Sequence, residues 1–260
     1  METVYEANEF VLGLVCFALM VVASEAGFRL ARRSGNQAPK DTKSQHLTVE
    51  AGILGVLGLL LGFTMSMALT RFEIRKHLVL EEAQAIRAAH LLTQLLPVEE
   101  GKEIADLLRA YTNVRIPGED GRDVYEQITA ARQESGRLQE ALWHRAVAYG
   151  QKDPNPVRSG LLLQSLKEVI QLDAARWMAF QDQVPATVIY AIAVVGLLAV
   201  MVVGYTFGLS GLRQPFSICM LSLAITLVLA IVVDVDRPRE GLIRVSQQPL
   251  LDLQKQLHSR

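Results

Sequence analysis

Four charged side chains lie at or just beyond the ends of long apolar segments, where they could act on ions. They are Glu25, Glu50, Arg71 and Glu82. Charges at such depths in a membrane segment are costly and often mark sites of ion binding or transport. Repeated around the axis of an oligomer, the carboxylates of Glu25 and Glu50 would form an acidic ring that attracts cations. The chemistry to consider first is therefore electrostatic selection of ions.

Each of these charges also has a plainer interpretation. The two carboxylates nearest the N-terminus could instead pair with Arg29 and Arg32 at the membrane interface. Arg71 could bind anions or lipid headgroups, or only extend its guanidinium group to the membrane surface. Glu82 lies either along a soluble vestibule continuous with a pore or in salt bridges to neighbouring helices. Because both signs are present, the sequence leaves ion selectivity open.

The sequence contains no pattern typical of catalysis or of a bound cofactor. Its five histidines are scattered, and it lacks a His-Glu-x-x-His motif, a phosphate-binding glycine loop and a serine elbow. Cys16 and Cys219 each fall inside an apolar segment, as is typical of small buried hydrophobic residues. The formal net charge of −1 gives no electrostatic reason to expect nucleic acid. We expect no enzyme activity, no catalytic residues, no metal and no cofactor.

Long apolar segments account for much of the chain, of which 50% is hydrophobic. A helix of about 20 apolar residues, rising ~1.5 Å per residue, crosses a bilayer core of ~30 Å. Four segments reach this length, at about residues 8–31, 49–71, 186–209 and 215–234. Glu2, Glu6 and Glu9 precede the first segment, where a signal peptide would carry Lys or Arg, so we expect a retained helix. The sequence thus predicts an all-α integral membrane protein with four transmembrane helices in a two-plus-two layout.

The polar middle of the chain, residues 73–184, is predicted to be a helical soluble region. Apolar residues recur there at helical spacing, and prolines at 97, 117, 154 and 156 separate the helices. This region is expected to be continuous with spans 2 and 3, between the membrane parts 1–72 and 185–234, with a tail at 235–260. Asp234 and Asp236 are expected to form a charged interfacial stop. The distribution of Lys and Arg slightly favours a cytoplasmic soluble region and cytoplasmic termini.

Glycines are concentrated in the second span, at Gly52, Gly55, Gly58 and Gly62. At 100° per residue, the last three lie within ~60° of one another around a helix. Small residues on one face let helix backbones approach closely in lipid. Two interpretations remain open: the face packs within one subunit, or part of it faces a central axis.

Four stretches of the sequence resemble motifs of known families. The pattern Leu61-Gly62-Phe63, six residues, then Thr70-Arg71-Phe72 resembles the second transmembrane helix of the bestrophins. Residues 24–29, 81–86 and 234–250 resemble signatures of the bacterial bestrophin-like membrane family, and this resemblance covers nearly the whole chain. Both resemblances imply a bestrophin-like fold.

The resemblance to bestrophins implies a pentameric ion channel whose second helix lines a pore with an apolar neck. Matched from Leu61-Gly62-Phe63, the neck falls on Gly55, Leu59 and Phe63, whose i, i+4, i+8 spacing places them on one face. Gly55 stands where the family has a bulky residue and Leu59 where it has an aromatic one, which implies either a wider neck or a differently packed helix. The acidic cluster of the bestrophin calcium clasp has too few counterparts here for calcium activation to be expected.

The implied partners are membrane lipid, further copies of the chain and a permeant small inorganic ion, in the bacterial inner membrane. Nucleic acid is not expected as a partner. The alternative function is a non-conducting membrane scaffold or sensor, in which the glycine-rich spans only pack and the soluble helices bind a partner.

Overall fold

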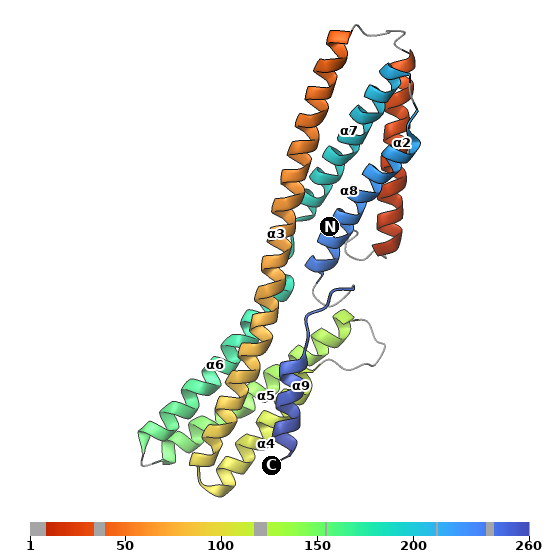
Figure 1. Ribbon diagram of the computed structural model, residues 1–260. Helices are drawn as coiled ribbons and strands as arrows, with labels where there is room; N and C mark the ends of the chain where they lie inside the picture. Colours follow the sequence, from red (N-terminus) through yellow and green to blue (C-terminus); the bar gives the residue numbers. More distant parts are fainter. Residues whose placement is uncertain are drawn as a thin grey trace. The chain divides into compact units, whose positions relative to one another are not determined.

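A computed structural model describes residues 9–33, 40–116, 124–153, 155–211, 213–237 and 242–259. The regular structure in these ranges is entirely helical, which confirms the predicted fold class (Figure 1). The chain divides into two compact units. Unit 1 comprises Met1–Arg71 and Gln183–Ile243, and unit 2 comprises Phe72–Asp182 and Arg244–Arg260.

Unit 1 contains the apolar helices α2 (Glu9–Arg33), α7 (Ala186–Ser210) and α8 (Pro215–Asp236), together with the first part of α3 (Lys40–Leu92). Four described helical stretches are long and apolar enough to cross a membrane, as predicted. Their shared core is formed by side chains from all four of these helices: Met20, Leu57, Ile192, Val200, Ile225 and Leu229. The burial of these side chains stabilises the packing of the four helices against one another.

The helix α3 is 53 residues long and contributes to both units. No Gly or Pro occurs from Phe63 to Leu96, so no residue of low helix propensity interrupts it there. It also begins at Lys40, before residue 49, where the second span was expected to start. Residues 40–48 are polar but contain no Gly or Pro, and Pro39 precedes them, which suits the start of a helix.

Unit 2 is a helical bundle formed by the remainder of α3, α4 (Val98–Arg115), α5 (Val124–Lys152), α6 (Pro156–Gln181) and α9 (Gln248–His258), with a short 3-10 turn at Thr93–Leu95. The Asn155 side chain caps α6 by accepting a hydrogen bond from the Val157 N–H, with Pro156 in the first turn. Gly136, a residue of low helix propensity, does not interrupt α5.

The C-terminal helix α9 is part of the core of unit 2, although the sequence analysis treated residues 235–260 only as a tail. Leu250, Leu253 and Leu257 are buried in the same cluster as residues of α3, α4, α5 and α6. Their i, i+3, i+7 spacing places them on one side of the helix. Arg109 of α4 donates a hydrogen bond from Nε to the carbonyl oxygen of Leu257 at 2.9 Å, which fastens the end of α9.

Candidate functional site

The part of α3 that belongs to unit 1 has two unlike faces. Leu57 lies in the core and Thr64 is buried. At 100° per residue, Gly55, Leu59 and Phe63 fall on the side opposite Leu57, within ~60° of the opposite point. The Leu59 and Phe63 side chains are 61% and 65% exposed. The residues matched to a neck therefore form an apolar surface, the neck face, that the other described helices leave uncovered.

The glycines of α3 do not pack against other described helices of the chain. A Cβ built at Gly52, Gly55, Gly58 or Gly62 would meet no atom within 4 Å. Among the described residues, nothing therefore supports the interpretation in which this glycine face packs within one subunit. The core side of α3 carries leucine and other apolar side chains, while the glycines lie around its outer side.

The close helix contact in unit 1 is instead between α2 and α7. A Cβ at Gly27 would overlap the Met201 carbonyl oxygen, and a Cβ at Gly204 would overlap the carbonyl oxygen of Ser24. A Cβ at Gly208 would lie 2.6 Å from α2 backbone. Sequence reasoning missed this contact, although Gly204 and Gly208 form the G-x-x-x-G pattern that permits close approach of helices in lipid.

Glu25 is held in ion pairs. Its Oε1 lies 2.8 Å from Arg29 Nε and 3.2 Å from Arg213 NH2. Arg29 was one of the predicted partners, whereas Arg213, from the connection between α7 and α8, was not. The ion pairs favour the plainer interpretation of this carboxylate over a free acidic ring.

Glu50 and Arg71 lie on the core side of α3. At 100° per residue they fall within about 20° and about 40° of Leu57 around the helix. Both side chains are half-buried. Since the neck face is on the opposite side, neither side chain shares a surface with Leu59 or Phe63.

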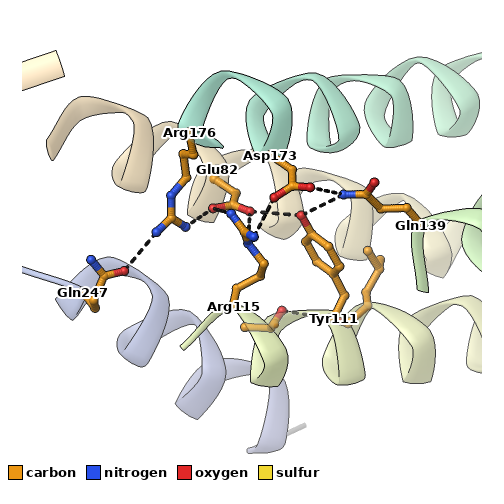
Figure 2. Close-up of polar contacts among 9 residues, drawn as sticks. Glu82, Tyr111, Arg115, Gln139, Asp173, Arg176 and Gln247 are labelled. Atoms are coloured by element: carbon orange, nitrogen blue, oxygen red, sulfur yellow. Dashed lines mark hydrogen bonds and ion pairs between the residues drawn. The ribbon is translucent and has the colours of Figure 1, made fainter. Parts of the chain in front are cut away.

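Among the described charged residues of unit 2, Glu82 is the most deeply buried. Figure 2 shows its polar contacts. Its Oε1 accepts hydrogen bonds from Arg115 Nε at 2.7 Å and from the Tyr111 hydroxyl at 3.0 Å. Its Oε2 forms an ion pair with Arg176. The vestibule interpretation of Glu82 is wrong, because a side chain with no exposed surface cannot line a vestibule, and the alternative of pairing with neighbouring helices is what the structure contains.

The position of Glu82 on α3 explains its burial. Val79 and Ile86, three residues before and four residues after it, are both buried in the core of unit 2. Side chains at this spacing share one face of a helix. Glu81 is exposed on the other side. The spacing of Val79, Glu82 and Ile86 in the sequence was enough to predict that Glu82 is buried and Glu81 exposed.

Further polar residues extend these contacts across the bundle. Asp173 pairs with Arg115 at 2.6 Å and accepts a hydrogen bond from Gln139 at 2.8 Å, and Arg176 donates to Gln247 at 3.1 Å. We call the whole set the Glu82 network: Glu82, Tyr111, Arg115, Gln139, Asp173, Arg176 and Gln247. It joins α3, α4, α5 and α6 to the residue that precedes α9, and its two carboxylates balance its two guanidinium groups.

The electrostatics of the network keep Glu82 ionised. Burial alone would raise the pKa of Glu82, but the guanidinium groups of Arg176 and Arg115 outweigh it and hold the pKa below its ordinary value. Burial, reinforced by the charge of Glu82, raises the pKa of Tyr111, which therefore stays a hydrogen-bond donor. The arrangement is that of a fixed structural ion cluster.

The two aspartates at the end of α8, Asp234 and Asp236, were predicted to form a charged interfacial stop. Both are buried. The Asp234 carboxylate accepts hydrogen bonds from the N–H groups of Leu242 at 2.7 Å and Ile243 at 3.0 Å, and Asp236 accepts one from Val184 at 2.8 Å. These carboxylates bind backbone donors that helix ends and loops leave unpaired. Over the described ranges, no group of three or more His, Cys, Asp or Glu side chains is placed to hold a metal ion.

The sequence matches the model of one known protein family over most of its length. The sequence model of the bestrophin-like domain matches residues 16–250. The chain belongs to the bestrophin-like family. None of the curated protein sequences matches it.

Solved structures with the same fold include bacterial bestrophin homologs. A variant of the homolog from Klebsiella pneumoniae has a TM-score of 0.71 and 14% identity over 97% of this chain and 98% of that chain. Another crystal structure of a bestrophin homolog from that organism has a TM-score of 0.69 and 14% identity over 96% and 97%. At this identity the likeness concerns the fold.

The predicted site residues of this bestrophin-like chain occupy four separate places. Gly55, Leu59 and Phe63 share the neck face, and Glu50 and Arg71 lie on the core side of α3. Glu25 pairs with arginines at the end of α2, and Glu82 lies in unit 2. The described part of a single chain leaves the neck face uncovered, with Leu59 and Phe63 exposed.

Proposed function

We propose that this bestrophin-like chain forms a homo-oligomeric ion channel, pentameric as the resemblance to bestrophins implies, with α3 around a central pore. The observation that carries the proposal is the uncovered neck face at Gly55, Leu59 and Phe63. A spanning helix that buries one side in its own subunit has its other side free for an axis shared with further copies.

The residues of this face suit an apolar constriction. A ring of leucine and phenylalanine side chains excludes water when it is narrow enough, and an ion then meets a barrier because it must lose hydration. The open glycines of α3 would let neighbouring copies approach closely. Phe63 is the bulkiest of the three residues, so it would form the narrowest ring.

The proposed setting is the bacterial inner membrane. The four spans contact lipid, and residues 73–184 form a soluble region on the cytoplasmic side together with both termini. The permeant species is a small inorganic ion. Because Glu25 is held in ion pairs and Glu50 lies away from the neck face, the barrier to ions in this proposal comes from the neck rather than from an acidic ring.

Replacing Phe63 with alanine is expected to increase ion flux by about tenfold, which corresponds to a barrier lowered by about 1.4 kcal/mol. The shorter side chain widens the ring and lets water wet the constriction. The measurement is ion release from liposomes that contain the purified chain, with Met65→Ala compared on the same helix.

Phe216→Ala is the matched control, since Phe216 is also an exposed phenylalanine of a span, 75% exposed, but belongs to α8. It should leave the flux unchanged. The oligomeric state of each variant is measured by native mass spectrometry. A monomer, or vesicles that stay tight with both Leu59 and Phe63 replaced by alanine, would overturn the channel and favour the non-conducting scaffold.

A further inference from the structure

The end of α2 carries a hollow with two kinds of lining. It has a volume of about 600 Å³. Its apolar lining is formed by Val21, Val22, Ala26 and Leu30. Val22 and Leu30 are among the large hydrophobic side chains that remain exposed. Such a surface on a spanning helix suits an acyl chain rather than water.

Arginines also line this hollow. Arg29 and Arg33 both belong to its lining, one turn apart on the same side of α2. Arg33 forms no hydrogen bond or ion pair with any residue that the structure describes, and its side chain is exposed. The guanidinium group of Arg29 uses Nε toward Glu25 and is 69% exposed. Donors on both groups are therefore available to a ligand.

Two further arginines are gathered beside the hollow. The Arg213 guanidinium carbon lies 4.8 Å from the centre of the Phe28 ring, and that of Arg32 lies 6.0 Å from it. Both distances are within or at the range of a cation–π contact. Glu25 accepts a hydrogen bond from Arg213 as well as one from Arg29. Glu25 and Phe28 thus hold arginines from two separate segments at one place.

The charges of this cluster are unbalanced. Among the described residues, the cluster contains four arginines (Arg29, Arg32, Arg33 and Arg213) and one carboxylate (Glu25), which leaves an excess charge of +3. Two arginines in the last turn are favourable for the helix dipole, but this accounts only for Arg32 and Arg33. It does not explain the approach of Arg213 or the apolar side chains that line the same hollow as Arg29 and Arg33.

We propose that this hollow is a binding site for an anionic phospholipid. The phosphate group contacts Arg29 and Arg33, and one acyl chain lies along Val22, Ala26 and Leu30. Arginine binds phosphate through parallel N–H donors, and arginine at the end of a span lies at the depth of lipid headgroups. A lipid with net negative charge is preferred, because the ammonium group of a zwitterionic lipid would be repelled by the excess of +3. The proposal rests on membrane insertion and does not require that the chain conducts ions.

The test uses the full chain purified in a non-ionic detergent. Phosphatidylglycerol or phosphatidylcholine is added, and native mass spectrometry measures the lipid retained. Wild-type protein should retain phosphatidylglycerol about tenfold more strongly than phosphatidylcholine. Equal retention of the two lipids would overturn the proposal, and this comparison needs no variant to fold.

Two variants separate the parts of the site. The double variant Arg29→Gln with Arg33→Gln should lose the preference, whereas Arg137→Gln with Arg145→Gln, the same change at exposed arginines of α5, should keep it. Ala26→Trp should weaken retention of phosphatidylglycerol by filling the hollow without changing charge. Unaltered retention in Ala26→Trp would contradict an acyl chain in the hollow, and unaltered retention in the first double variant would contradict the headgroup site.

A competition experiment distinguishes a binding site for lipid from a binding site for any small anion. Inorganic phosphate in large excess should displace little phosphatidylglycerol, because phosphate alone gains nothing from the apolar lining. Displacement at the same concentration that phosphatidylglycerol itself requires would show a simple anion site and overturn the lipid proposal.

Discussion

Replacing Glu82 with glutamine is expected to lower the free energy of unfolding of unit 2 by about 3 kcal/mol. The change keeps the shape of the side chain but leaves Arg115 and Arg176 without the carboxylate that they share. Both tryptophans of the chain, Trp143 and Trp177, belong to unit 2, so intrinsic fluorescence during heating reports on this unit. The midpoint should fall by roughly 10 °C.

Glu81→Gln is the matched control. It removes the same charge at the neighbouring position of α3, where the side chain is exposed. Its fluorescence midpoint should stay within about 1 °C of the wild-type value, because isolated surface charges contribute little. Equal shifts for the two variants would show that Glu82 contributes only its formal charge and that the Glu82 network has no structural role.

The same network predicts how the stability of unit 2 depends on pH. The pKa of Glu82 is lower in the folded chain than the ordinary value of about 4.3 in an unfolded chain. The unfolded state therefore binds the proton first as pH falls, and the stabilisation present above pH ~4.3 is lost as the pH drops through the folded pKa. The difference between the thermal unfolding midpoints of the wild-type and Glu82→Gln proteins should become smaller as the pH is lowered. A difference that becomes larger would contradict a lowered pKa of Glu82 in the folded chain.

The elements of the fold were largely predictable because local physics determines them. Apolar length predicts the spans, and prolines separate the helices of unit 2, as at Pro97 before α4 and Pro156 in the first turn of α6. The start of α3 was harder, since polar residues without Gly or Pro suit a helix and a connector equally. Gly136 has a low helix propensity, yet it does not end α5, because one unfavourable residue is not enough to end a helix of 29 residues that packs in a core.

The candidate site was less predictable because its contacts are distant in sequence. Arg115 and Arg176 lie 33 and 94 residues from Glu82, and no local pattern connects them. The spacing of Gly55, Gly58 and Gly62 shows that they share a face but not what the face meets. Close backbone contact occurs instead between α2 and α7, where Gly27, Gly204 and Gly208 oppose backbone atoms.

Replacing Gly204 with alanine is expected to destabilise unit 1 by about 3 kcal/mol. The new Cβ would overlap the backbone of Ser24, including its carbonyl carbon at 2.8 Å and its Cα at 2.9 Å. Backbone cannot move aside as a flexible side chain can, so α2 and α7 must separate. Cys16 and Cys219 are free and both belong to unit 1, so their reaction with a maleimide dye during heating reports on this unit. The midpoint should fall by roughly 10 °C.

Gly13→Ala provides the control for this change, since a Cβ at Gly13 of α2 meets no atom within 4 Å. Alanine there should leave the cysteine midpoint unchanged or slightly higher, because it favours the helix. The two reporters also separate the two units: Gly204→Ala should shift the cysteine transition more than the tryptophan transition, and Glu82→Gln should do the reverse. A cysteine transition that Gly204→Ala leaves in place would contradict the close α2–α7 contact, because no nearby side chain could absorb the added methyl group.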